Sequence, residues 1–315
     1  MTPLTSNPAI GSVKQIHISA PGPNGALSGT MTLATDPSAP VVLIIPGSGP
    51  TDRDGNSPLG VKAATYRLLA EELAIHGVTT VRIDKRGMFA SAGACPDANA
   101  VTVEDYVVDI HSWVNAIREK TGSKCVWLLG HSEGGLVALK TVQQAKDICG
   151  LILLATPGRP LGEGLKEQLR ANPANESLLT QSDAAIDTMV AGKHFAVEGM
   201  HPALAPLFRE AVQGFLISLF KIDPCQLAAR VEIPVLIIQG EHDLQVGVTD
   251  AKMLKAASPT AKLVLLPDAN HVLKPVISAD RGANFATYAD PHLPLVSGVT
   301  EVIADFVRLT GTQQL

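Results

Sequence analysis

Residues 126–140 read VWLLGHSEGGLVALK, and this stretch decides how the rest of the chain is interpreted. Its apolar start is typical of a buried strand, and its second half can continue as a helix. Between the two, Gly130, Ser132 and Gly134 form the pattern G-x-S-x-G. Small residues on both sides of the serine let the backbone turn sharply and lift the hydroxyl clear. We therefore interpret the stretch as a nucleophile elbow, with Ser132 as the nucleophile.

Strand-like and helical segments alternate on both sides of the elbow. Apolar runs without alternation, typical of strands covered on both faces, occur at residues 41–45, 78–83, 151–154, 235–239 and 262–266. A period of two at residues 13–19, a turn signal at 21–25 and a stretch at 27–34 that can return as a second arm predict an opening antiparallel hairpin. Thr102 and Asp105 resemble a capping box, and Gly122 can end the helix that they begin. The alternation predicts an α/β fold with a doubly covered, mostly parallel sheet.

The pattern changes between residue 157 and about residue 230, where helical stretches occur without any strand-like run. An insertion of this kind is compatible with one large domain, since 315 residues can bury a sizeable core. We therefore predict a core domain made of residues 1–156 and 234–315, with a helical cap inserted at residues 157–233.

Composition narrows the classes of function. Hydrophobic residues make up 46% and charged residues 17% of the chain, as in a compact globular enzyme, and the net charge of -5 offers no basic field for nucleic acid. The four cysteines show no C-x-x-C pair and no histidine at ligand spacing, so we predict neither a metal site nor a disulfide framework but four reduced thiols. With no apolar stretch of membrane-spanning length and no signal segment, the prediction is a soluble, cytoplasmic protein that makes no membrane contact.

A serine hydroxyl near neutral pH needs a base that takes its proton and a carboxylate that orients the base. For this kind of elbow the expected chain order is serine, acid, histidine. Asp243 follows the predicted strand that ends at residue 239, and His271 follows the next strand. We assign His271 as general base and acid and Asp243 as its orienting carboxylate, with Glu241 and Asp268 as competing acids.

Acyl transfer also requires backbone donors for the developing oxyanion. The residue after the nucleophile, Glu133, supplies one N–H, and the glycine-rich loop after residue 45 supplies the second. In that loop Ser48 is the first choice and Gly49 the alternative. The Glu133 side chain is left open between a structural ion pair and a substrate contact.

Three further residues are assigned to substrate binding or loop support, namely Gly47, Arg53 and His131. Asp52, Asp54 and Asn56 are expected to buttress the same loop by hydrogen bonds rather than to react.

At these motifs the chain resembles the α/β-hydrolase superfamily, over residues 41–306. The loop PGSGPTDRDGN at 46–56, the segment RIDKRG at 82–87 and GHSEGG at 130–135 are similar to a bacterial carboxylesterase branch related to serine-aminopeptidase-like hydrolases. The resemblance implies an eight-stranded sheet, a helical cap over the site, no cofactor, and hydrolysis of short-chain acyl esters. The chain departs from hormone-sensitive-lipase-like esterases, because no His-Gly-Gly-Gly motif precedes the site.

The leading hypothesis is a carboxylesterase whose small-molecule partner is an acyl ester. The alternative is a serine aminopeptidase or amidase, which would need a cap carboxylate to hold a free amine. A non-catalytic receptor on a hydrolase fold is kept as a third hypothesis because fold alone never fixes function, but the intact Ser132, Asp243 and His271 argue against it. The oligomeric state is left open, with a homodimer as one option. The carboxylates available in the cap are Glu163, Glu167, Glu176, Asp183 and Asp187.

Overall fold

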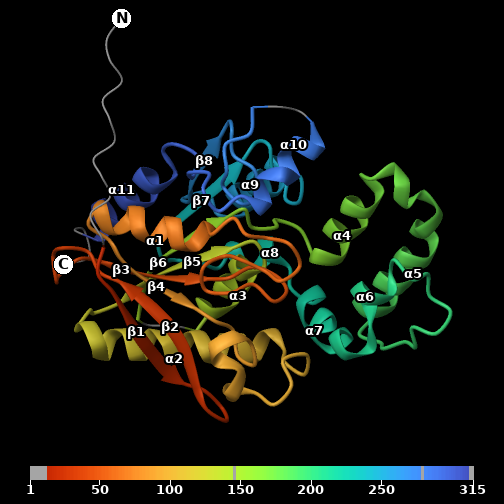
Figure 1. Ribbon diagram of the computed structural model, residues 1–315, viewed down its shortest axis with the longest axis horizontal. Helices are drawn as coiled ribbons and strands as arrows, with labels where there is room; N and C mark the ends of the chain where they lie inside the picture. The colour runs from red at the N-terminus through yellow and green to blue at the C-terminus, as the bar shows by residue number, and fades with distance from the viewer. Residues whose placement is uncertain (1–12, 145–146, 278–279, 312–315) are drawn as a thin grey trace, which may run out of the picture.

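The computed structural model describes residues 13–144, 147–277 and 280–311 (Figure 1). Its centre is an eight-stranded sheet with the strand order β1-β2-β4-β3-β5-β6-β7-β8. The first two strands form the predicted antiparallel hairpin, β2 pairs antiparallel with β4, and the strands from β4 to β8 run parallel. The prediction of an eight-stranded, mostly parallel sheet is confirmed. The strands are β1 (Gln15–Pro21), β2 (Ala26–Thr32), β3 (Val41–Ile45), β4 (Thr79–Ile83), β5 (Val126–His131), β6 (Ile148–Leu154), β7 (Val235–Gly240) and β8 (Lys262–Leu266).

Helices cover both faces of this sheet, and α1 and α2 lie on opposite sides of it in Figure 1. Strand β3 shows why its run is apolar throughout: Leu43 packs into the core on the face of α2, α3 and α9, whereas Val42 and Ile44 pack on the face of α1 and α11. A strand buried on both faces has no polar side, so its sequence loses the period of two. The covering helices are α1 (Thr65–Ile75), α2 (Val103–Thr121), α3 (Glu133–Thr141), α9 (Val248–Ala257) and α11 (Val299–Gly311).

Helix α2 has the predicted ends. The Thr102 side chain accepts a hydrogen bond from the Asp105 N–H, and the Asp105 carboxylate accepts one from the Thr102 N–H. At the other end Gly122 has φ 75°, a left-handed conformation that glycine adopts without a steric penalty. Three short helices complete the core: η1 (Phe89–Ala94), α10 (Arg281–Ala286) and η3 (Thr287–Ala289).

The segment between β6 and β7 is helical in the described chain, and its first helices lie together beside the sheet in Figure 1. Ile186, Met189 and Phe208 form the centre of a separate apolar cluster within it. Helix α7 reaches the core, where the Ser218 hydroxyl accepts a hydrogen bond from the Val103 N–H. The division at residues 157 and 233 stays a prediction. The helices are α4 (Leu161–Arg170), η2 (Pro173–Leu178), α5 (Leu179–Val190), α6 (Ala205–Phe208), α7 (Glu210–Phe220) and α8 (Pro224–Ala228).

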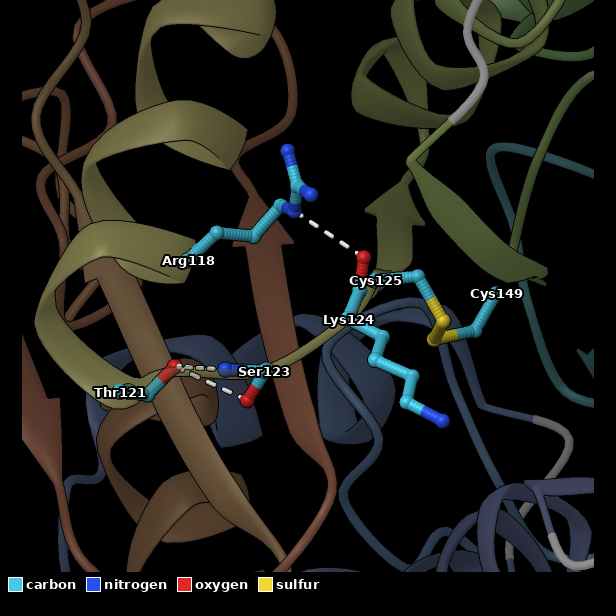
Figure 2. The surroundings of a disulfide bond; sticks show 6 residues. All are labelled: Arg118, Thr121, Ser123, Lys124, Cys125 and Cys149. Atoms are coloured by element: carbon cyan, nitrogen blue, oxygen red, sulfur yellow. Dashed lines mark hydrogen bonds between the residues drawn. A yellow bond between two sulfur atoms is a disulfide. The ribbon is translucent and has the colours of Figure 1, made fainter. Parts of the chain in front are cut away.

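The prediction of four reduced thiols is wrong. Cys125 and Cys149 form a disulfide with their Cα atoms 5.3 Å apart, while Cys95 and Cys225 are free (Figure 2). The two bonded residues are 24 positions apart and belong to no spacing motif. They meet because β5 and β6 pair in parallel with Val126 opposite Ile148, which places the starts of the two strands side by side. None of the described helices is both long enough and apolar enough to span a membrane.

Candidate active site

Ser132 occupies the turn between β5 and α3 with φ 54° and ψ -122°. A residue other than glycine is strained in this conformation, and such strain collects at functional sites. The two glycines of the motif are required by close backbone contacts. A Cβ on Gly130 would lie 2.3 Å from the Gly134 oxygen, and one on Gly134 would lie 2.3 Å from the Ile45 oxygen. The G-x-S-x-G pattern is therefore the sequence that this turn permits.

Asp243 and His271 lie on the loops that follow β7 and β8, as the sequence order predicted. The Nδ1 of His271 is 2.7 Å from the Oδ2 of Asp243, whose side chain is fully buried. The other oxygen of Asp243 accepts hydrogen bonds from the N–H groups of Gln245 and Val246. Burial alone would raise the pKa of Asp243, but His271 and these donors hold that pKa below its ordinary value, so the carboxylate stays ionised.

Ser132 and His271 line one cavity of 140 Å³. The structure thus brings the three predicted triad residues together at the carboxyl edge of the sheet, which is the usual ligand edge of such sheets. The competing acids, Glu241 and Asp268, are exposed, and the carboxylate bonded to His271 is that of Asp243.

The loop after β3 lies against the elbow. A Cβ on Gly47 would lie 3.4 Å from the Cβ of Ser132. Among the described residues, no acceptor takes the N–H of Ser48 or that of Glu133. Gly49, the alternative donor, has φ 68° and accepts a hydrogen bond from the Thr51 N–H through its carbonyl. The geometry therefore leaves backbone donors on both sides of the serine.

His131 and Tyr66 link the loop after β3 to the loop that carries His271. The Gly47 N–H donates to the Tyr66 hydroxyl at 3.0 Å, and that hydroxyl is 2.8 Å from the Nδ1 of His131. The Nε2 of His131 is 2.9 Å from the His271 oxygen. Since a carbonyl only accepts, Nε2 carries the proton and Nδ1 accepts from Tyr66. Burial lowers the pKa of His131 to about 3, so the ring is neutral. Its Nε2 is then always the donor and its Nδ1 always the acceptor in these two bonds.

Tyr66 was not assigned to the site from the sequence. A buried tyrosine usually finds a hydrogen-bond partner for its hydroxyl, and this rule is the signal that could have drawn attention to it.

Lys85 is a second residue that sequence reasoning did not assign to the site. Its ammonium donates to the Gly47 oxygen at 2.7 Å and lies 3.8 Å from a carboxylate oxygen of Glu133. Both side chains are buried. Of the two roles left open for the Glu133 side chain, a structural ion pair and a substrate contact, the structure shows the ion pair, which it forms with Lys85. Burial lowers the pKa of Lys85, and the Glu133 carboxylate opposes that shift.

The polar residues after Gly47 are engaged in the bonds expected of a buttress. Arg53 donates through Nε to Asp84 at 3.0 Å, and Asp54 pairs with Arg82. Asp52 accepts from the N–H groups of residues 54 and 56. These bonds occupy the charged groups of the loop and hold it against β2 and β4. Among the described residues, no group of three or more metal-ligating side chains could hold an ion.

A larger cavity of 570 Å³, also lined by Ser132, opens between the core and the helices after β6. Its walls are mainly apolar, with Leu161 and Leu165 of α4 and Phe215 and Leu219 of α7 among them. A cavity of this kind suits an apolar group attached to a reacting carbonyl.

None of the five carboxylates considered for amine binding lines this larger cavity. Three of them are held in ion pairs within the described chain: Glu167 pairs with Arg159, Asp183 with Arg170 and Asp187 with Lys166. The other two, Glu163 and Glu176, are exposed.

Comparison with known proteins finds similar sequences and structures among hydrolases. A family model described as "Serine aminopeptidase, S33" matches residues 59–181. Esterase EstD of Thermotoga maritima is 27% identical over 250 residues, which are 74% of this chain and 54% of that protein. The chain therefore spans about half the length of this curated relative.

Solved structures resemble the whole chain. The Pyrococcus furiosus esterase Pf2001 superposes with a TM-score of 0.59 at 16% identity, covering 98% of this chain and 96% of the other. Proline iminopeptidase of Mycobacterium smegmatis also gives 0.59, at 18% identity, with 95% and 100% covered. Identities this low show the fold alone. Together with the sheet order, the comparisons confirm the predicted α/β-hydrolase fold and the resemblance to that superfamily.

Proposed function

We propose that this protein of the α/β-hydrolase fold is a carboxylesterase that works through an acyl-enzyme on Ser132. The observation that carries the proposal is the 2.7 Å bond between His271 and Asp243 beside the cavity that His271 shares with the strained serine. The S33 match and the likeness to esterase EstD support a hydrolase.

The proposed mechanism gives each of these groups a role. Asp243 holds Nδ1 of His271, which leaves Nε2 to take the proton as Ser132 attacks the ester carbonyl. The N–H groups of Ser48 and Glu133 receive the negative charge that develops on the carbonyl oxygen. His271 then protonates the departing alcohol and activates the water that releases the acid. Because Asp243 stays ionised, it stabilises the imidazolium that forms in both halves of the reaction.

The large cavity favours an ester over a peptide with a free amino end. An aminopeptidase needs an anion that holds the substrate ammonium, and the walls of the 570 Å³ cavity carry none of the five cap carboxylates. Glu133 does line the cavity, but its charge is paired with Lys85. Short-chain acyl esters remain the predicted substrates, and the volume also admits longer acyl groups. The serine aminopeptidase activity is kept as the second candidate because of the S33 match.

A fluorophosphonate probe tests the hydrolase proposal. We expect covalent labelling of the native protein and no labelling of Ser132→Ala, with Ser177→Ala, an exposed serine of the cap, as the matched control that labels normally. Equal labelling of Ser132→Ala and the native protein would overturn the proposal, and so would a native protein that does not label.

A substrate comparison then separates the two enzymatic candidates. We expect p-nitrophenyl esters to be turned over faster than aminoacyl anilides, and a series of acyl lengths gives the limit of the pocket. Faster turnover of the anilides would reverse the order of the two candidates.

Cellular location stays a prediction, and the disulfide bears on it. Four reduced thiols would agree with the predicted cytoplasmic location, whereas disulfides persist mainly in oxidising compartments. Counting free thiols in denatured protein taken from its native host distinguishes the two cases. Two reactive thiols are expected where the disulfide forms, and four would restore the support for a reducing cytoplasm.

A further inference from the structure

Lys85 is buried beside the site and has no part in the proton transfers described above. Its ammonium donates at 2.7 Å to the carbonyl oxygen of Gly47, in the loop that carries one of the proposed oxyanion donors. It also lies 3.8 Å from the carboxylate of Glu133, whose backbone N–H is the other proposed donor. One buried cation thus contacts the two segments that must face the same oxygen atom.

The Gly47 oxygen and the Ser48 N–H belong to a single planar peptide unit, in which the two groups point in opposite directions. An acceptor drawn toward Lys85 therefore turns the Ser48 N–H away from Lys85. The reverse orientation of this peptide would present a carbonyl oxygen in place of the donor. Gly47 has no Cβ to restrict its ψ angle, so local sterics do not select one orientation.

The neighbouring peptide unit is fixed from the other side. The Gly47 N–H donates to Tyr66, whose hydroxyl is bound to neutral His131. With the Gly47 oxygen on Lys85 and its N–H on Tyr66, both polar backbone groups of Gly47 have a buried partner. Among the described residues, neither the N–H of Ser48 nor that of Gly49 has a hydrogen-bond acceptor, and the Ser48 N–H is the one that shares a peptide unit with the Gly47 oxygen.

We propose that Lys85 is a positioning residue for the oxyanion hole: it holds the 47–48 peptide in the orientation that presents the Ser48 N–H, and its ion pair with Glu133 ties that donor to the one beside Ser132. This assignment rests on the proposed esterase mechanism. The Nζ of Lys85 contacts the Gly47 oxygen, the Glu133 carboxylate and the Tyr106 ring rather than a side chain of the triad, so its effect on the developing oxyanion passes through the peptide that it binds.

The variant Lys85→Met tests the proposal, because methionine fills a similar volume without donating a hydrogen bond. Removing an oxyanion donor outright costs roughly 10²- to 10³-fold in kcat, so losing its support is expected to lower kcat about 10- to 100-fold while KM changes little. A residue with a merely structural role would reduce the folded fraction and leave the kcat of the folded protein intact.

A trifluoromethyl ketone gives a readout that a structural role would not move. Ser132 adds to its carbonyl carbon, the serine proton passes to His271, and the resulting hemiketal oxygen sits where the oxyanion forms. The pKa of that oxygen can be followed by fluorine NMR. We expect the pKa to be higher in Lys85→Met than in the native protein, because the oxyanion has lost a well-placed donor.

The orphaned carboxylate of Glu133 is the main confounding effect, since an unpaired buried anion beside the oxyanion would itself oppose the reaction. The matched variant is Lys85→Met combined with Glu133→Gln, which removes both charges and keeps the Glu133 backbone N–H. We expect this pair to retain a reduced kcat and a raised hemiketal pKa. If Lys85→Met does not fold, the uncharged double variant carries the same measurements.

Native kcat and native hemiketal pKa in the double variant would overturn the assignment of Lys85. Unchanged values in a folded Lys85→Met would do the same. Failure of the proposed function is a separate result, because the native protein would then form no hemiketal and hydrolyse no ester.

Discussion

The two ends of β5 differ in what they contain. At its carboxyl end the chain turns through the strained Ser132 into α3, beside the buried His131. At its amino end Cys125 is bonded to Cys149 at the start of β6 (Figure 2). One end thus stores strain beside polar groups, whereas the other carries a covalent cross-link. The same strand pair therefore carries the candidate site at one edge of the sheet and a covalent cross-link at the other.

The two ends are connected by hydrogen bonds as well as by the strand itself. The Ser132 N–H donates to the Leu154 oxygen at 2.9 Å, so the elbow is anchored on the end of β6. The disulfide fixes the beginning of that same pair. If this division of roles is correct, changes at the carboxyl end should affect activity, and changes at the amino end should affect stability.

The largest expected effect is at the carboxyl end. Ser132→Ala removes the nucleophile and should lower kcat/KM for p-nitrophenyl esters by roughly 10⁴- to 10⁶-fold. Its free energy of unfolding should stay near the native value, because alanine keeps the backbone conformation and the Leu154 bond. Kinetic assays check the loss of activity, and denaturant unfolding of the same preparation checks that the free energy of unfolding is unchanged. Retained activity would contradict the assignment of the active site to the carboxyl end of β5.

The disulfide should give the next largest effect, on stability alone. The bond closes a loop across 24 positions, and chain entropy predicts that its loss lowers the free energy of unfolding by about 3 kcal/mol. Reduction with dithiothreitol, or the double variant Cys125→Ala with Cys149→Ala, should leave kcat intact well below the melting temperature. A large fall in kcat of the folded, reduced protein would show that the two ends are coupled.

His131 should make stability depend on pH. Its pKa falls from 6.5 to about 3 on folding, so the unfolded chain binds more protons between these values and stability is lost as the pH drops through this window. The native protein should lose about 2 kcal/mol more between pH 7 and pH 5 than His131→Gln does. Urea titrations at several pH values give the two slopes. Parallel slopes would mean that the ring is not buried neutral.

The smallest expected effect concerns strain at the elbow. Ser132→Gly should be more stable than Ser132→Ala by about 1 kcal/mol, because glycine adopts φ 54° and ψ -122° without steric cost. The two inactive variants are compared in the same unfolding experiment. A glycine variant less stable than the alanine variant would show that the backbone at Ser132 is not strained.

Much of the fold could be predicted because its signals are local. The apolar runs, the capping box at Thr102 and the glycine at residue 122 each act within a few residues, and the structure has the corresponding strands and helix ends. The approach of Asp243 to His271 was also predictable, since parallel strands place their carboxyl ends at one edge.

The rest depended on contacts that no local pattern carries. The pairing of Cys125 with Cys149 follows from the register of β5 and β6, which the sequence does not state. The contact of Lys85 with Gly47 joins residues 38 positions apart through two different loops. The segment RIDKRG, which contains Lys85, was recognised as part of the resemblance, but only the folded chain shows that the Lys85 ammonium reaches the Gly47 oxygen.

The central claim is that Ser132 carries the acyl group, and trapping that intermediate tests it most directly. The protein is mixed rapidly with a p-nitrophenyl ester, quenched in acid and digested for mass spectrometry. We expect a burst of p-nitrophenol and an acyl adduct on the peptide that contains Ser132. Ester hydrolysis without a burst, or an adduct confined to another residue, would contradict it.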